Sequence, residues 1–240
     1  SCQKNLQVLI RESMPNFEAA IAGLNTGASV MVRGSLIESE GKGQKWELLA
    51  ETVVLMGEVD ALYPMQKKGH TPEFLREIAH LRGRGNLMSA VFRVRSRLAF
   101  AIHNFFQTKG FLYVHTPIIT SSDCEGAGEM FRVTTLHPKE PPLDEAGHVD
   151  FSKDFFGKKT YLTVSGQLQG EAMACALGRI YTFGPTFRAE NSHTSRHASE
   201  FWMIEPEAAF FELEDNMNLA EEMIKYLVKD VVENCADEIE

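Results

Sequence analysis

The sequence predicts a mixed α+β fold, and three patterns support that prediction. Apolar runs of strand length occupy residues 6–11, 28–37 and 45–56 near the N-terminus. Apolar side chains recur at helical spacing over residues 89–108 and again over residues 213–232. Residues 180–187 and the run that starts at Phe201 have the composition of two strands around a polar loop. We therefore expect a β-rich first part followed by a larger core of strands and helices.

The first part of the chain reads as a small β module. Its three predicted strands are separated by turn residues that include Gly41 and Gly43. Three strands do not close a small barrel, so the residues alone support a β module and leave a purely structural role open. Gly57, Pro64 and Gly69 then break the pattern before a short helix predicted over residues 72–81. These changes predict a first domain over residues 1–57, a linker over 58–86 and a main domain over 87–240.

The main domain begins with the clearest amphipathic helix, over residues 89–108, which ends at Gly110. A strand over residues 111–114 and Pro117 follow it. Residues 137–157 look like an excursion between two strands and carry no chemical signature. The next strand, residues 160–164, leads into a segment rich in glycine and glutamine, and an alanine-rich helix is predicted over residues 172–177.

Composition limits the class of protein. The 240 residues are 44% hydrophobic, enough for one substantial core and a small second one, and no apolar run is long enough to span a bilayer. The N-terminal residues lack the apolar region of a secretory signal, so we expect a cytoplasmic protein without a membrane partner. The four cysteines are scattered without metal spacing, and no metal site is predicted.

Charge is unevenly distributed. The formal net charge of -9 argues against unselective binding of nucleic acid. The stretch over residues 67–97 is nevertheless rich in lysine and arginine, with only Glu73 and Glu77 against them. This stretch either faces RNA or forms a solvated helix surface, and the sequence leaves both readings open.

The polar loop at residues 188–200 is the strongest functional signal. Arg188 and Glu190 lie two residues apart at the end of one predicted strand, so they point to the same side. Arg196 and His197 lie in the loop, and Phe201 begins the return strand. A guanidinium forks onto phosphate or carboxylate oxygens and an aromatic ring stacks on a purine, which indicates nucleotide chemistry. An ordinary ion pair beside core aromatics is the structural alternative. His193 and His197 are interpreted as loop histidines of an ATP site and not as metal ligands.

These residues and four further segments resemble a known family. Phe187, Arg188 and Glu190, followed by Arg196, His197 and Phe201, resemble the second signature motif of class II aminoacyl-tRNA synthetases. Four segments, in the order of the family, resemble asparaginyl-tRNA synthetases: YPMQK with EFLR and HLR at residues 63–82, GFLYVHTP at 110–117, DCEGAGEMF at 123–131 and SGQLQGE at 165–171. The chain is thus identified as a member of this family within the aspartyl, asparaginyl and lysyl subgroup.

The resemblance implies a fold and a reaction. It implies part of a class II catalytic core, built on an antiparallel sheet, preceded by part of an OB-fold barrel that binds the anticodon. The implied enzyme is an asparagine–tRNA ligase that uses ATP and Mg²⁺ to form asparaginyl-adenylate and transfers asparagine to tRNA. In that reading Arg188 is catalytic and binds the α-phosphate and the substrate carboxylate. The other ATP residues are Arg196 and His197 at the outer phosphates, Phe201 at the adenine face, and Glu190, which contacts the adenosine or the incoming tRNA end. The helix and strand over residues 89–120 are expected to form a homodimer interface, although simple core packing predicts the same apolar stripe.

The resemblance also implies the amino-acid site. Glu125 closes on the substrate ammonium from a mobile loop, Ser165 and Gln167 lie near the amino group, and Glu171 reads the amide. A carboxylate accepts the two N–H donors of asparagine, whereas aspartate would bring two negative charges together. For Glu171 an interaction with the N-terminal end of a helix dipole is the structural alternative.

The third class II motif has no counterpart after Glu207. We therefore expect the 240 residues to be part of a longer protein and to be inactive alone. Two other functions stay open: an ATP-dependent asparagine synthetase related to this core, and a non-catalytic RNA-binding module. The β module favours the ligase over the synthetase, because a small-molecule amide ligase needs no anticodon-binding domain.

Overall fold

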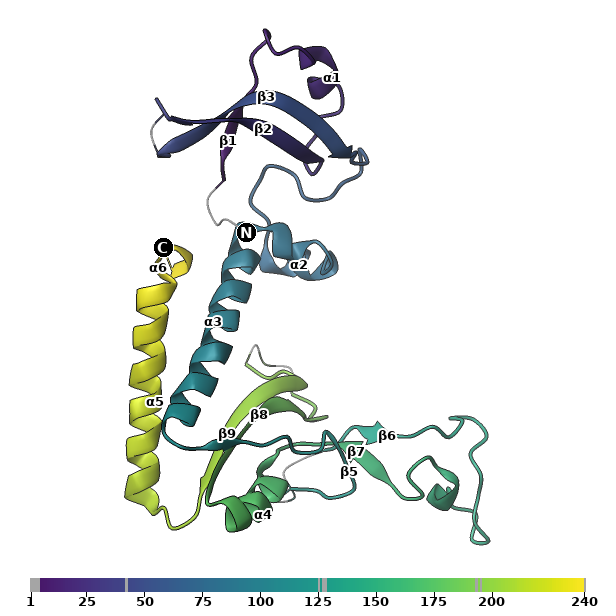
Figure 1. The fold of residues 1–240 in the computed structure, drawn as a ribbon. Helices are drawn as coiled ribbons and strands as arrows, with labels where there is room; N and C mark the ends of the chain where they lie inside the picture. The colour runs from purple at the N-terminus through teal and green to yellow at the C-terminus, as the bar shows by residue number, and fades with distance from the viewer. Residues whose placement is uncertain are drawn as a thin grey trace. The chain divides into compact units, whose positions relative to one another are not determined.

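The computed structural model describes residues 5–41, 43–124, 126, 129–192, 194 and 196–239, and its fold is mixed α+β, as the sequence predicts. The chain forms two compact units, one comprising Ser1–Arg97 with Val231–Glu240 and the other Leu98–Asp230. Figure 1 shows their elements. In the part of the chain that the structure describes, no helix is long and apolar enough to cross a membrane.

The first unit contains the predicted β module. Its strands are β1 (Gln7–Leu9), β2 (Ser29–Glu38) and β3 (Trp46–Gly57), and they form an open sheet in the order β1-β3-β2. Strand β1 is parallel to β3, and β2 is antiparallel to it. Helix α1 (Phe17–Ile21) contributes Ala20 to a small core with Met14, Ala50 and Val53. All three predicted strands are confirmed, and among the described residues they do not close a barrel.

The segment after β3 contains little regular secondary structure, as predicted. Helix α2 (Pro72–Glu77) starts after Thr71, whose hydroxyl accepts a hydrogen bond from the backbone of Phe74 at 3.3 Å. It ends four residues before the predicted limit, and a 3₁₀ turn, η1 (Arg82–Arg84), follows. The guanidinium of Arg84 donates a hydrogen bond to the hydroxyl of Tyr63 at 3.0 Å, so the two ends of the segment are joined.

Helix α3 (Asn86–Thr108) starts three residues before the predicted helix and ends as expected. Gly110 has φ +77°, and the backbone of Phe111 donates to the carbonyl of Phe106 at 3.0 Å, which is a glycine-dependent helix end. In the second unit, Ile102, Phe105 and Phe106 of α3 pack with Phe111, Tyr181 and Leu219 in the main core. Leu219, Met223 and Leu227 of the acidic helix α5 (Leu213–Asn234) face this core, as its predicted stripe requires. The short helix α6 (Ala236–Ile239) follows α5.

Two three-stranded sheets complete the second unit. The first has the order β4-β8-β9, where β4 (Leu112–Tyr113) is parallel to β8 (Arg179–Phe187) and β9 (Glu200–Ala208) is antiparallel to β8. The second has the order β5-β7-β6, with antiparallel pairs of β5 (Ile119–Thr120), β7 (Thr160–Leu162) and β6 (Arg132–Val133). The predicted excursion lies between β6 and β7, carries the 3₁₀ turn η2 (Phe151–Lys153), and extends away from its sheet (Figure 1).

Helix α4 (Gln167–Leu177) corrects one prediction. The sequence predicts an alanine-rich helix that starts only at residue 172. The helix begins at Gln167 and includes Gly170, whose missing side chain leaves room for β8: a Cβ there would lie 3.5 Å from Cδ1 of Ile180. Close packing on the sheet outweighs the low helix propensity of glycine.

Candidate active site

The site is built on the β8–β9 hairpin, whose strands alternate between two environments. Tyr181 and Phe183 point to the core, where the Tyr181 ring stacks on Phe106 with centroids 4.7 Å apart. Thr182, Gly184 and Thr186 lie on the opposite face, and Thr186 is paired with Phe201 of β9. Beyond the last pair, the backbone of Arg188 donates to the carbonyl of Ser199 at 3.0 Å. This bond fixes the base of the polar loop that carries the predicted ATP residues.

The predicted ATP residues line one pocket of about 310 Å³. Its lining consists of Arg188, Glu190, Ser192, Arg196, His197, Ala198, Ser199 and Phe201. Among the described residues, the pocket therefore presents two guanidinium groups and an imidazole around a single carboxylate and one aromatic ring. Such a lining is suited to a ligand that is both anionic and planar.

Arg188 is the best placed of these residues to bind an anion. Its guanidinium carbon lies 5.5 Å from the centroid of Phe201, which holds the side chain over the ring. Its Nε atom is buried and has no hydrogen-bond partner among the described residues. A buried donor without a partner costs about 1–3 kcal/mol, and more when it is charged, so an acceptor from a ligand would stabilise this arrangement. A phosphate or carboxylate oxygen supplies that acceptor.

Backbone hydrogen bonds join the hairpin to the neighbouring segments. The N–H of Phe187 donates to the carbonyl of Thr163 at 2.9 Å, and the N–H of Ala189 donates to the carbonyl of Glu129 at 2.7 Å. The first bond brings the end of β7, and with it the segment from Ser165 to Glu171, beside β8. The second brings the segment predicted to close on the amino acid to the base of the Arg188 loop.

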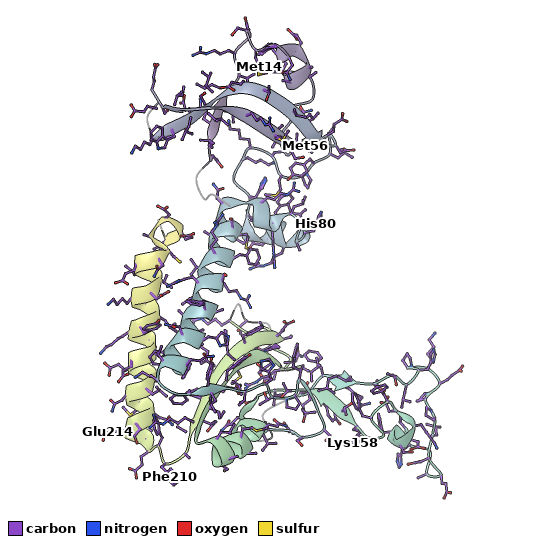
Figure 2. All side chains as sticks on the ribbon, viewed as in Figure 1. Met14, Met56, His80, Lys158, Phe210 and Glu214 are labelled. Atoms are coloured by element: carbon purple, nitrogen blue, oxygen red, sulfur yellow. The ribbon has the colours of Figure 1, made fainter. Side chains whose placement is uncertain are left out.

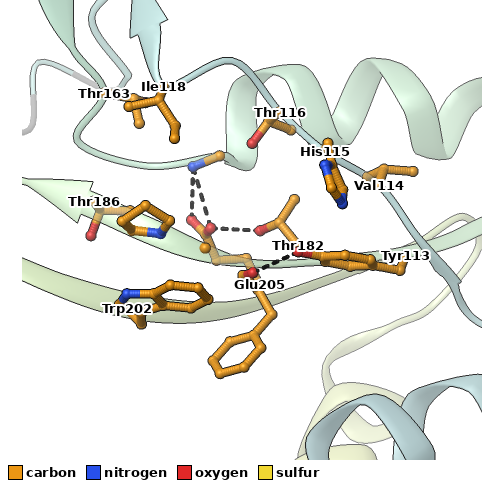
Figure 3. Close-up of a pocket in the computed structure, with 14 residues that line it drawn as sticks. Tyr113, Val114, His115, Thr116, Ile118, Thr163, Thr182, Thr186, Trp202 and Glu205 are labelled. Carbon is orange, nitrogen blue, oxygen red and sulfur yellow. Dashed lines mark hydrogen bonds between the residues drawn. The ribbon is translucent and has the colours of Figure 1, made fainter. Parts of the chain in front are cut away.

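Glu205 lines a second pocket of about 230 Å³, which residues of β8 and β9 help to form (Figure 3). Its carboxylate accepts hydrogen bonds from the hydroxyl of Thr182 at 2.6 Å, from the N–H of Gly166 at 3.2 and 3.3 Å, and from the hydroxyl of Ser165. Figure 3 shows the Thr182 hydroxyl directed at the carboxylate of Glu205. Glu205 therefore holds the start of the SGQLQGE segment against β8 and β9.

Gly166 is confined by its neighbours. A Cβ on this residue would lie 2.6 Å from Oγ1 of Thr116, 3.2 Å from Oε2 of Glu205 and 3.2 Å from Oγ1 of Thr182. Glycine is needed here for space, since its φ of -85° suits any residue.

The predicted amino-acid residues are in part brought together. Ser165 is buried. Its hydroxyl donates a hydrogen bond to Glu205 and accepts one from the N–H of Gln167 at 3.0 Å. Gln167 donates its amide to Oε1 of Glu171 at 3.1 Å, one turn along α4. Glu171 thus lies in the second turn of the helix, where the dipole effect of the N-terminus has faded. Gln167 and Glu171 line neither of the two pockets described above. Glu125 and His193 lie outside the described residues.

The sequence did not assign a role to Glu205. It is one of three glutamates in β9, and what distinguishes it is its place opposite Thr182 in the register of the hairpin. Among the described residues, no group of three or more histidines, cysteines or carboxylates is able to hold a metal ion.

Comparisons with known proteins agree with this architecture. A family model described as tRNA synthetases class II (D, K and N) matches residues 71–240. The chain is 63% identical over 237 residues to an asparagine–tRNA ligase of Alkaliphilus oremlandii, covering 99% of this chain and 51% of the relative. It is 60% identical to an asparagine–tRNA ligase of Clostridium novyi, again over 99% of this chain and 51% of the relative. The chain thus spans about half the length of the curated relatives it matches.

Solved structures show the same fold. The asparaginyl-tRNA synthetase of Pyrococcus horikoshii complexed with asparaginyl-adenylate matches with a TM-score of 0.82 and 28% identity, covering 98% of this chain and 50% of that one. The asparaginyl-tRNA synthetase of Entamoeba histolytica, with a TM-score of 0.79 and 20% identity over 98% of this chain and 50% of that one, shares the fold. With a family model that covers more than two thirds of its residues and a hairpin that gathers the residues of the second signature motif, the chain belongs to the class II tRNA synthetases of the D, K and N group.

Proposed function

We propose that the full-length protein is an asparagine–tRNA ligase. The observation that carries this proposal is the convergence of Arg188, Glu190, Arg196, His197 and Phe201 on one pocket. The names of its relatives, and the asparaginyl-adenylate in a similar structure, support asparagine as the amino acid. The proposed domains are an anticodon-binding part over residues 1–57, a linker over 58–86 and the beginning of a catalytic domain over 87–240.

The reaction proceeds in two steps. A carboxylate oxygen of asparagine attacks the α-phosphorus of ATP, and the bond to the bridging oxygen breaks to release pyrophosphate. A ribose hydroxyl at the end of the tRNA then attacks the acyl carbon, and AMP leaves with the bonding electrons. Neither step requires a side-chain nucleophile, so catalysis rests on orientation and on stabilising charge.

Arg188 is the proposed catalytic residue. Negative charge gathers at the α-phosphate and the attacking carboxylate in the first transition state, where a planar guanidinium binds both groups. The unpartnered Nε of Arg188 favours this role because the ligand would complete its hydrogen bonding. Phe201 would stack on adenine with the ring face that Arg188 leaves open.

The remaining pocket residues would hold the outer phosphates. Arg196 and His197 supply positive charge and N–H donors, and Glu190 is the single carboxylate among the described residues of the lining. Mg²⁺ prefers oxygen ligands and is commonly bound through one or two carboxylates together with substrate phosphates. Mg²⁺ would accompany ATP, and Glu190 would contact the adenosine or the incoming tRNA end.

The amino acid would lie beside Ser165, Gln167 and Glu171, with Glu125 closing over its ammonium group. Oε1 of Glu171 accepts from Gln167, which orients the carboxylate, and its other oxygen would accept the amide of asparagine. Aspartate would be rejected because two carboxylates would meet there. Glu205 acts by positioning, since it holds the backbone of Gly166.

The same proposal includes the partners and the setting. These are tRNA as the second substrate, a homodimer formed through residues 89–120, and a cytoplasmic location.

The test is ATP–pyrophosphate exchange by the full-length protein, with asparagine and with aspartate, for the wild type and Arg188→Ala. Exchange that requires asparagine and is lost in Arg188→Ala is the expected result. Aspartate turnover to asparagine with ammonia would instead identify a synthetase of the free amino acid. Exchange with neither amino acid would leave an RNA-binding protein built on the same fold.

A further inference from the structure

The excursion between β6 and β7 ends in a tight turn with two phenylalanines at its tip. The N–H of Gly157 donates to the carbonyl of Asp154 at 2.9 Å, which places Phe155 and Phe156 at the two central positions of a β-turn. Gly157 has φ +63°, a conformation that favours glycine. Central turn positions are usually held by Gly, Pro, Asn, Asp or Ser. Two large aromatic residues there call for a reason beyond forming the turn.

Both rings are presented to solvent. Phe155 is 77% exposed and Phe156 is 45% exposed, and their ring centroids lie 4.8 Å apart at an interplanar angle of 78°. An aromatic side chain removes about 150–250 Å² from water when it is covered. This pair is therefore a contact surface with a large apolar area still available.

Hydrogen bonds to the side chain of Asp154 hold the turn in place. The Asp154 side chain is buried and accepts hydrogen bonds from Oγ1 of Thr134 at 2.6 Å, from the N–H and Oγ1 of Thr135, both at 2.9 Å, and from the N–H of Phe155 at 2.8 Å. These bonds lower the pKa of Asp154 to about 2. The backbone that carries the two rings is thus fixed before any partner binds, which reduces the entropy lost on binding.

Positive charge surrounds the rings. Lys153 precedes the turn and Lys158 and Lys159 follow it, and all three are exposed. Figure 2 labels Lys158 on this excursion. Nζ of Lys159 and Cζ of Arg132 lie 5.3 and 5.2 Å from the ring centroid of Phe151, so these two cations gather at the base of the turn.

Two carboxylates in or beside the turn offset part of this charge, since a hydrogen-bonded carboxylate stays negative. Asp154 is buried among its donors, and Asp150 accepts from the N–H of Ser152 at 3.0 Å and from its hydroxyl at 2.6 Å. The exposed charge of residues 153–159 is therefore positive, on a chain whose formal net charge is -9. Local complementarity to an anion is built against the overall charge.

We propose that residues 153–159, here called the diphenylalanine turn, bind unpaired nucleotides of the tRNA. Bases stack on Phe155 and Phe156, and Lys153, Lys158 and Lys159 contact the flanking phosphates. Exposed aromatic rings among cations are the pattern by which proteins hold single-stranded nucleic acid, and a phenyl ring accepts any base. That the RNA is a tRNA rests on the proposed function; the stacking of single strands does not. A protein partner is less well matched, since a stable protein interface buries about 800 Å² on each side and has a less charged centre.

The experiment uses the full-length protein and three RNAs: a single-stranded dodecamer of mixed sequence, a hairpin without unpaired ends, and the tRNA. The Phe155→Ala/Phe156→Ala variant loses both stacking surfaces and is expected to bind the dodecamer and the tRNA at least about 30-fold more weakly and the hairpin without change. Phe155→Trp/Phe156→Trp keeps the stacking surfaces and is expected to bind the dodecamer like the wild type. Leu143→Ala, at an exposed position of the same excursion, is the matched control and is expected to have no effect.

Two further readings separate this inference from the proposed function. ATP–pyrophosphate exchange without tRNA should be equal in the wild type and Phe155→Ala/Phe156→Ala, because the turn does not line the pocket of Arg188. Lys158→Gln/Lys159→Gln should reduce the slope of log K against log salt for the dodecamer by about 1.4, at about 0.7 for each phosphate contact. If exchange fails in the wild type while dodecamer binding still depends on the two rings, the ligase proposal fails and the turn stands.

Three results would overturn the inference. Full RNA affinity in the alanine variant would exclude the rings from the contact. Full affinity in Phe155→Leu/Phe156→Leu would show that any apolar side chain suffices and that stacking is not involved. A lower unfolding temperature or a loss of self-association in the alanine variant, with RNA affinity unchanged, would show that the rings pack against the protein itself.

Discussion

Replacing Gly166 by alanine should destabilise the second unit, and the structure gives the reason. The added Cβ would lie 2.6 Å from Oγ1 of Thr116, a distance that real Cβ atoms do not show, and 3.2 Å from oxygens of Glu205 and Thr182. Because φ is -85°, the backbone itself accepts alanine, so the whole effect comes from this contact.

The expected cost of Gly166→Ala is about 1–3 kcal/mol, the usual range for one carbon forced into a packed site. Gly184 on the same hairpin is the matched control, since a Cβ there has no heavy atom within 4 Å, and its alanine variant should stay within about 0.5 kcal/mol. The assay is urea unfolding followed by tryptophan fluorescence in a Trp46→Phe background. Trp46 and Trp202 are the only tryptophans of the 240 residues, and Trp202 lines the pocket of Glu205.

Adding Thr116→Ala to Gly166→Ala removes the nearest clashing atom. The double variant should recover part of the lost stability, which a double-mutant cycle measures as a favourable coupling. Equal stability of Gly166→Ala and Gly184→Ala would refute the argument that space, and not backbone freedom, requires glycine at position 166.

Three further predictions concern the anion site, the buried acid and the core. Arg188→Lys should lower the rate of asparagine-dependent exchange by about 10²–10³-fold, because a point charge replaces the guanidinium fork; a change in the KM for ATP alone would contradict a role in the transition state. The pKa of Asp154 is lowered to about 2, so its carboxylate stabilises the folded protein above the unfolded pKa, and this stabilisation is lost as pH falls from about 4 towards 2. Asp154→Asn should therefore flatten the fall of the urea midpoint with pH over that range, and an unchanged fall would contradict this. Phe106→Ala should cost about 3–5 kcal/mol in the same unfolding assay, because its ring is 0% exposed within the main core; a cost below about 1 kcal/mol would contradict this packing.

The hairpin was predictable because the pattern that indicates it is continuous in the sequence. Two apolar runs on either side of a charged loop predict both strands and place Arg188 and Glu190 on one side. The single pocket lined by Arg188, Arg196, His197 and Phe201 was therefore foreseeable from short-range pattern alone, with the family resemblance as further support.

The role of Glu205 was not predictable in this way. Its three donors come from Thr182, across the hairpin, and from Ser165 and Gly166, about forty positions earlier in the chain. Only the strand register and the contact between Phe187 and Thr163 bring them together. The start of α4 was missed for a related reason, since Gly166 and Gly170 fit close tertiary packing, which local propensity does not reveal.

The diphenylalanine turn was not predicted because the residues around it contain no motif that indicates a binding site. A run of Lys, Asp, Phe, Phe, Gly and Lys is ordinary loop composition until the hydrogen bond from Gly157 to Asp154 shows where the rings must point.

The two-sided character of β8 has a practical consequence for changing substrate preference. Tyr181 and Phe183 serve the core, while Thr182, Gly184 and Thr186 face the pockets. A library of variants at residue 184 alone, where an added Cβ has no heavy atom within 4 Å, would thus sample new ligand contacts while the buried positions of the strand, Thr182 and Thr186 among them, stay fixed. Randomising the whole strand would mix variants that fail to fold with variants that bind differently, and selection would then mostly report the folding failures.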